Sequence, residues 1–263
     1  MSKGLFKWPS GRRTSVSAKA GSTGLGTSYR VIFNTLLIFI ASQLIAAFLV
    51  ELILGLAHQG EHGANLFNQS ITAQFFYVLI AEGLAAYFVI GLVRRRGMKL
   101  SAIGLGRRPV WNDVWRAAGG FVVFYALLIV AGVLLSLLIP SFNTNQTQDL
   151  GFNNINTSSQ NVLAFIALVL LPPLGEEPLV RGYLYSGLRK HFTFRRAMIL
   201  TSLLFGLAHL EFGNGGPLVW GAAIDTFILS VVLVYLREKS GALWAGMLVH
   251  FLNNLVAFGI HFK

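Results

Sequence analysis

Three groups of polar residues lie inside apolar stretches in the last third of the chain. The groups are Glu176 and Glu177 with Arg181, then His209, then His250 with Asn254. A charged group at the centre of a membrane-spanning helix costs roughly 2.5 to 3.5 kcal/mol on insertion scales, so such groups mark a functional site by default. We therefore expect these side chains to form one site, which the rest of the chain holds in place.

The first group combines an ion pair with a candidate general base. On a helix, Glu177 and Arg181 are neighbours at positions i and i+4, so they can pair and order their segment. Glu176 is turned about 100° away by the helical period and can face a different cavity. Its carboxylate is then available to act as a general base on a water molecule.

The histidines allow two kinds of chemistry. His250 and Asn254 are also at i and i+4, where a ring nitrogen and an amide suit the stabilisation of an oxyanion. Alternatively, Glu176, His209 and His250 form a donor set for zinc with an open fourth position for water. The local HExxH zinc signature is absent. The cofactor therefore stays unknown, with zinc as the alternative.

The composition indicates an integral membrane protein. Hydrophobic residues make up 54% of the 263 residues and charged residues 12%, with a mean hydropathy of +0.64. This is too apolar for an ordinary soluble domain. Several helices of about 20 residues each would consume nearly all of the chain as one bundle. The sequence has no cysteine, which excludes disulfides, a thiol nucleophile and Cys-ligated zinc.

The distribution of positive charge predicts the orientation. Basic residues gather at 1–30, 94–116, 189–196 and 237–239, whereas the connections 59–71, 141–160 and 211–217 have no Lys or Arg. By the positive-inside rule, the basic segments and the N-terminus face the cytoplasm. In a prokaryote the membrane would be the cell membrane. The net charge of +11 then serves contact with anionic lipid headgroups, and we expect no nucleic-acid partner.

The predicted fold is all-α, a polytopic transmembrane bundle of about seven to eight spans. Residues 1–30 read as a disordered basic tail in the cytoplasm, and 31–263 as a single transmembrane domain with 161–258 as its catalytic core. Spans are expected at about 31–57, 72–93, 117–140, 161–188, 197–210, 218–236 and 241–260.

The fourth span is too long and too rich in proline to be a straight helix. At 1.5 Å per residue it would reach about 42 Å, more than the hydrocarbon core of about 30 Å. It also contains Pro172, Pro173 and Pro178. We therefore expect the motif-bearing helix to be kinked or broken.

The three groups resemble the signatures of the CAAX prenyl protease and bacteriocin-processing (CPBP) family of intramembrane proteases. Those signatures are Glu-Glu-x-x-x-Arg, Phe-x-x-x-His and His-x-x-x-Asn, and the chain matches them in order at 176–181, 205–209 and 250–254. The resemblance covers about residues 161–258. The chain departs from the pattern at Val180, where a bulky aromatic is common, and at Pro178, inside the first motif.

The resemblance implies an intramembrane endopeptidase of glutamate or metallo type. Glu176 would activate water, His209 would help to position it, and His250 with Asn254 would stabilise the oxyanion. With Glu177 and Arg181, these are the candidate catalytic residues. The implied partners are membrane lipids and a peptide or membrane-protein substrate, including a prenylated C-terminus.

Two other functions fit the same residues. One is a non-proteolytic scaffold or immunity protein that binds a peptide or a lipidated partner in the same cavity. The other is an ion-coupled transporter, whose carboxylates and histidines near the middle of the membrane would titrate during transport. Glu51, Glu82 and Asp225 also lie in predicted spans. Each of them can pair with a neighbouring helix, so we leave their roles open and leave them out of the site.

Overall fold

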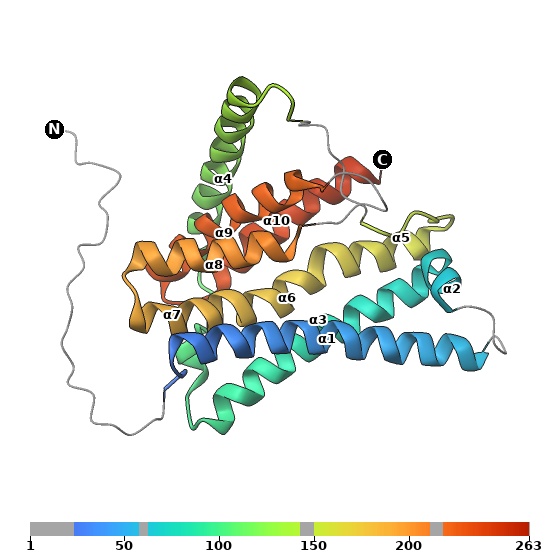
Figure 1. Ribbon diagram of the computed structural model, residues 1–263, viewed down its shortest axis with the longest axis horizontal. Coiled ribbons are helices and arrows are strands. Elements are labelled where there is room, and N and C mark those ends of the chain that lie inside the picture. The colour runs from blue at the N-terminus through green and yellow to red at the C-terminus, as the bar shows by residue number, and fades with distance from the viewer. Residues whose placement is uncertain (1–23, 58–62, 143–149, 211–217, 263) are drawn as a thin grey trace.

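The fold is all-α, as predicted (Figure 1). The computed structural model describes residues 24–57, 63–142, 150–210 and 218–262. The separate helices are α1 (Ser28–Ala57), α2 (Gly63–Gln69), α3 (Ile71–Arg95), the short 3₁₀-helix η1 (Leu100–Ile103), α4 (Trp111–Leu138), α8 (Phe194–Ala208), α9 (Trp220–Ser240) and α10 (Trp244–His261). The segment 158–191 is a continuous run made of α5 (Ser158–Phe165), η2 (Ile166–Leu170), α6 (Leu171–Glu177), η3 (Pro178–Leu184) and α7 (Tyr185–His191).

Five helices in the described part of the chain are long and apolar enough to cross a membrane. They are α1, α3, α4, the segment 158–191 and α9. A multi-pass membrane protein is thereby confirmed. The expected fifth and seventh spans are present as helices α8 and α10, but α8 has only 15 residues and α10 carries the polar residues of its own motif. Five of the seven to eight expected spans are thus supported by length and composition.

The motif-bearing segment 158–191 is bent, as expected from its prolines. It contains two π-helical stretches, η2 and η3. The carbonyl of Leu168 would accept from residue 172 in an α-helix or from residue 173 in a π-helix, and both are prolines without an N–H. Asn254 Nδ2 donates to this carbonyl instead, at 3.0 Å. Helix α10 is therefore fastened to the bend in the motif helix.

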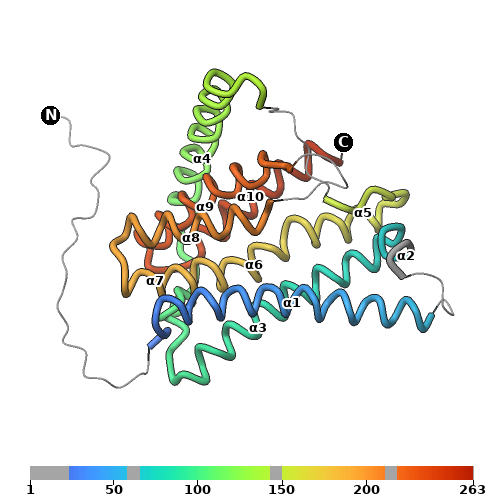
Figure 2. Tube along the Cα trace, viewed as in Figure 1, coloured from blue at the N-terminus to red at the C-terminus, as the bar shows by residue number. Residues whose placement is uncertain are grey.

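The segment 158–191 lies between two groups of helices (Figures 1 and 2). Helices α1 and α3 pack against one side of it, and α8, α9 and α10 against the other, whereas α4 leans out of the bundle and packs against α9 and α10. Every side chain of η3 is buried. Residues on η3 can therefore be reached from both groups of helices.

The end of the predicted tail is packed against the bundle. Residues 1–23 lie outside the described residues, but Leu25 is buried and α1 already begins at Ser28. The Tyr183 hydroxyl donates to the Leu25 carbonyl at 3.2 Å and accepts from Asn34 Nδ2 at 2.9 Å. Arg96 also donates to the Leu25 carbonyl. These bonds join α1, the end of α3 and η3 near the basic end of the bundle.

Helices α3 and α6 approach closely at Gly175. A Cβ atom on Gly175 would lie 2.8 Å from the backbone oxygen of Glu82 and 2.9 Å from its Cα, and it would overlap the Glu82 carboxyl. Only a residue without a side chain allows this contact. Gly175 thus sets the distance between the motif helix and α3.

Substitution of Gly175 by alanine should destabilise the protein. Gly175→Ala would push α6 away from α3, and we expect a loss of about 1–3 kcal/mol in the free energy of unfolding, as for other overpacked cores. Gly83→Ala is the matched control, because a Cβ there meets nothing within 4 Å and alanine favours helix by up to about 1 kcal/mol. Thermal unfolding in detergent would measure both. Equal melting temperatures for the two variants would contradict the close approach.

Candidate active site

A buried ion pair forms the inner wall of the site. The side chains of Glu177 and Arg181 are both 0% exposed, and Arg181 Nη1 donates to Glu177 Oε1 at 2.8 Å. The guanidinium also lies over the ring of Phe205, 4.1 Å from its centroid. The pairing follows the i, i+4 spacing, as predicted. The contact between Arg181 and Phe205 joins η3 to α8.

His250 brings α10 to both glutamates. Its Nδ1 is 3.1 Å from Glu177 Oε1, and its Nε2 is 3.8 Å from Glu176 Oε2. We expected Glu176 and Glu177 to face different cavities. Both carboxylates instead lie near the same imidazole, one at each ring nitrogen of His250. Glu176 Oε2 is buried and has no hydrogen-bond partner among the described residues.

His209 ends α8, and its ring packs on Phe205 with centroids 4.6 Å apart. Its Nδ1 is 2.9 Å from the carbonyl oxygen of Phe205. A carbonyl only accepts, so Nδ1 carries the proton, and Nε2 of the neutral ring is an acceptor. The ring of Phe205 also stands edge-on to that of His250, at 6.3 Å. The ring of Phe205 therefore lies next to both imidazoles and to the guanidinium of Arg181.

Glu176 and His209 meet in a small apolar pocket between α1, η3 and α8. Its other lining residues are Ile32, Thr35, Leu36, Phe39, Leu179, Val180, Leu184, Leu204, Phe205 and Ala208. The volume of about 50 Å³ is enough for water. Leu36, one of its lining residues, is 42% exposed, so the pocket reaches the surface of the helix bundle. A carboxylate and an imidazole thus share one cavity within apolar walls.

The side chain of Asn254 contacts the backbone of the motif helix. The bond to the Leu168 carbonyl uses one amide hydrogen, and the amide nitrogen carries a second. The neighbouring Asn253 binds α4, because its Oδ1 accepts from the Tyr125 hydroxyl at 3.3 Å. Asn254 therefore has a structural partner that its spacing from His250 did not predict.

Two carboxylates that sequence reasoning left out lie beside the site. Glu82 on α3 abuts Gly175 and is within electrostatic range of Glu176. Asp225 on α9 is within electrostatic range of His250. Glu51, in contrast, is exposed on α1. Glu82 lies near the middle of α3, but the sequence alone does not say that α3 packs on α6.

The zinc alternative does not fit the geometry. Among the residues that the structure describes, no group of three His, Cys, Asp or Glu side chains is placed to hold a metal ion. The proposed set of Glu176, His209 and His250 is therefore not assembled around one point, and a metalloprotease is not supported.

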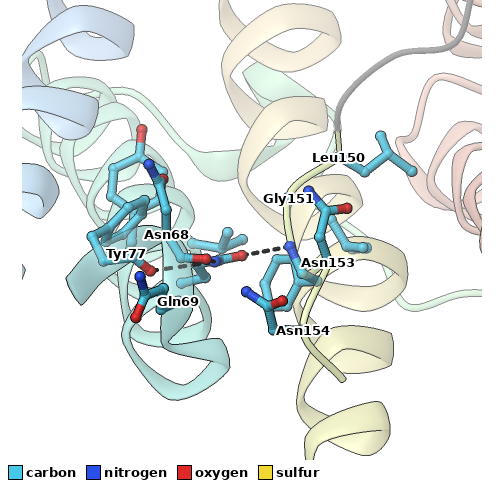
Figure 3. Close-up of a pocket in the computed structure, with 12 residues that line it drawn as sticks. Asn68, Gln69, Tyr77, Leu150, Gly151, Asn153 and Asn154 are labelled. Atoms are coloured by element: carbon cyan, nitrogen blue, oxygen red, sulfur yellow. Dashed lines mark hydrogen bonds between the residues drawn. The ribbon is translucent and has the colours of Figure 1, made fainter. Parts of the chain in front are cut away.

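A second cavity, of about 650 Å³, lies near the N-terminal end of α3 (Figure 3). Figure 3 shows Asn68, Gln69 and Tyr77 on one side and Asn153 and Asn154 on the other. Gln74 spans the two sides, because its Nε2 donates to the Asn68 carbonyl at 2.9 Å and its Oε1 accepts from the Phe152 amide at 2.5 Å. Among the residues that the structure describes, the lining consists of amides, aromatic rings, aliphatic side chains and a glycine.

Comparison with known proteins yields one family. The model of the family described as "Type II CAAX prenyl endopeptidase Rce1-like" matches residues 158–256. An Escherichia coli protein described as "Uncharacterized 24.3 kDa protein" is 27% identical over 134 residues, which are 50% of this chain and 57% of that protein. The chain thus spans little more than half the length of this relative. No solved structure matches the present chain.

The family match agrees with the resemblance predicted from the three motifs. It begins with α5 and ends within α10, so it contains the buried ion pair, both histidines and Asn254. Residues 158–256, which hold all three motifs, are thus similar to the Rce1-like family of type II CAAX prenyl endopeptidases.

Proposed function

We propose that this protein is an intramembrane endopeptidase in which Glu176 activates the water that hydrolyses a peptide bond. The observation that carries the proposal is the pocket in which Glu176 and His209 meet from two helices. The family match supports it, since the family is one of peptidases. The site lies in the bundle, so the substrate would be cut within the membrane.

In the first step, water lies between Glu176 and His209. His209 Nε2 accepts one water hydrogen and fixes the orientation of the molecule. Glu176 takes the other proton as the oxygen attacks the carbonyl carbon, which gives a tetrahedral oxyanion. Proton transfer by a positioned carboxylate contributes about 10²- to 10⁴-fold to a rate. Glu176 then returns the proton to the leaving amine, and the C–N bond breaks.

His250 and Asn254 are the donors that we assign to the oxyanion. Because Nδ1–H of His250 is directed at Glu177, His250 would donate through Nε2–H of its imidazolium form. Asn254 can serve this role because its amide nitrogen has a second hydrogen beside the one given to Leu168. We assign a positioning role to Glu177 and Arg181. Glu177 Oε1 lies 3.1 Å from His250 Nδ1, and Arg181 forms an ion pair with Glu177. No step requires a metal ion.

The walls of the pocket indicate the substrate class. Apart from Glu176, His209 and Thr35 the lining is apolar, and the lining residue Leu36 is exposed at the surface of the bundle. Such a site accepts an apolar stretch of a membrane protein or leader peptide, or a prenylated C-terminus, as the family name suggests. We place the basic segments and the N-terminus in the cytoplasm, with anionic lipids at that surface.

Glu176→Gln should abolish cleavage without unfolding the protein. The amide keeps the size of the side chain but cannot accept the proton, so we expect a loss of about 10²- to 10⁴-fold. Newly exposed N-termini and trimmed C-termini would be compared in membranes from cells that carry wild type, Glu176→Gln or the control Glu51→Gln. Ends shared by wild type and Glu51→Gln, and missing from Glu176→Gln, are expected and would name the substrate. Identical ends in all three, at equal expression, would favour a binding scaffold.

Asn254→Leu should lower both stability and activity, and a second substitution should separate the two effects. The leucine leaves the Leu168 carbonyl without a partner, at a cost of about 1 kcal/mol. In a Pro172→Ala background, the restored N–H of residue 172 can bond to that carbonyl, so the stability cost should shrink while the loss of cleavage stays.

Unfolding and cleavage would be measured for wild type, both single variants and the double variant. The same stability cost in both backgrounds would contradict the role of Asn254 at Leu168. Cleavage retained by Asn254→Leu would remove Asn254 from the oxyanion site.

A further inference from the structure

We propose that the groove between α4 and α9 binds an anionic phospholipid, with the headgroup at Arg116 and Lys239 and one acyl chain along the apolar walls. The groove has a volume of about 740 Å³, which lies in the range of about 300–1,000 Å³ that is usual for ligand pockets. It shares no lining residue with the pocket of Glu176 and His209. Lipid binding here goes beyond the proposed function and does not depend on peptide cleavage.

The walls of the groove are apolar and belong to helices that can cross a membrane. Helices α4 and α9 are both long and apolar enough to do so, and they pack against each other where α4 leans out of the bundle (Figure 1). The walls include Val123 and Leu127 of α4, Met198 of α8 and Val231 of α9. Since Val123 and Leu127 are exposed, the groove reaches the surface of the bundle, and a lipid can enter it from the bilayer.

The two cations of the groove lie at the same end of it. Arg116 is near the start of α4 and Lys239 near the end of α9, and both line the groove. Trp111 and Trp115 are exposed at the same end of α4. Exposed tryptophans are typical of the interface between membrane and water. This end of the groove therefore lies at the level of the lipid headgroups.

The positive charge at this end is not cancelled by the nearest carboxylate. Arg116 Nη1 is 3.9 Å from Asp113 Oδ1, which is longer than a hydrogen bond. Arg107 engages Asp113 instead, with each of its two terminal nitrogens 2.6 Å from a carboxylate oxygen. Among the residues that the structure describes, the lining of the groove contains no Asp or Glu. Arg116 and Lys239 are thus placed to receive a phosphate group.

The distance along α4 matches one acyl chain in one leaflet. From Arg116 to Leu127 the helix rises about 16 Å at 1.5 Å per residue, and half of a hydrocarbon core of about 30 Å is about 15 Å. Basic pockets between membrane helices bind anionic headgroups in this way. A phospholipid uses both the charged end and the apolar walls, whereas free phosphate would use the charged end alone.

Gly119 keeps the groove open beside the contact of α4 with α9. At Gly120 a Cβ atom would lie 2.8 Å from Leu236 Cδ1, so the helices touch there. Gly119 also lines the groove, but a Cβ on it would meet nothing within 4 Å. A large side chain at 119 can therefore fill the groove without forcing the helices apart. Gly132 is the matched control, because it lies on the same helix, is equally open and does not line the groove.

The headgroup site can be tested by native mass spectrometry of the full-length protein, delipidated in detergent and titrated with dioleoylphosphatidylglycerol or dioleoylphosphatidylcholine. We expect phosphatidylglycerol to bind more tightly. The double variant Arg116→Gln/Lys239→Gln should lose about 30-fold in affinity for it, as expected for two contacts of Lys or Arg with anionic headgroups. The double variant Arg94→Gln/Arg95→Gln removes the same charge from the exposed end of α3 and should bind like wild type.

The acyl-chain site has its own variants. Gly119→Phe should weaken the binding of both lipids, because the ring occupies the groove, whereas Gly132→Phe should leave both affinities unchanged. An excess of inorganic phosphate should not displace phosphatidylglycerol from wild type. If Gly119→Phe does not fold, Val123→Phe on the same wall takes its place.

Equal affinity of wild type for the two lipids would overturn the proposal, and so would an equal loss in the two charge variants. Phosphatidylglycerol binding that survives both ring substitutions in the groove, or that inorganic phosphate displaces, would also overturn it and would indicate a surface anion site. A protein that cleaves no peptide but shows the expected lipid affinities would uphold the lipid site and overturn the peptidase alone.

Discussion

The cost of burying charge is the constraint on which the rest of this structure depends. Glu177 and Arg181 are both withdrawn completely from solvent, and removal of one partner from such a pair typically costs about 3–5 kcal/mol. Arg181 Nε and Nη2 find no hydrogen-bond partner among the described residues. The face of Phe205 offsets part of this deficit through a cation–π contact. The pair is stable only while η3, α8 and α10 stay together.

The bend of the motif helix follows from the same need. A straight α-helix would leave the carbonyl of Leu168 without a donor, because the next residues in either helical register are prolines. Asn254 supplies the donor from α10. Helix α10 is thus bound twice to the segment 158–191, at Leu168 and, through His250, at the glutamates. Two contacts on one helix fix both its rotation about its axis and its position along the motif helix. This rotation and this position determine where His250 can point.

Local spacing was enough to predict part of the site. Glu177 and Arg181 pair as i, i+4 neighbours, and the motif helix bends where its prolines predict. His250 reaches the glutamates, in keeping with the expectation that the three polar groups form one site. The partner of Asn254 was missed, although two adjacent prolines signal an unpaired carbonyl. Glu82 was missed for a different reason: helical periodicity does not say which helices pack together, and only the contact at Gly175 brings α3 to α6.

The division of the chain between matched and unmatched helices has a consequence for specificity. The groups that we assign to the reaction lie within residues 158–256, which match the family. Three of the apolar walls of the pocket, Ile32, Leu36 and Phe39, come from α1, and Glu82 comes from α3. Both helices precede the match. The groups that we assign to the reaction therefore lie in the matched part of the chain, whereas part of the pocket wall comes from a helix outside it. We expect substitutions in α1 to alter the shape of the pocket while the three motifs stay intact.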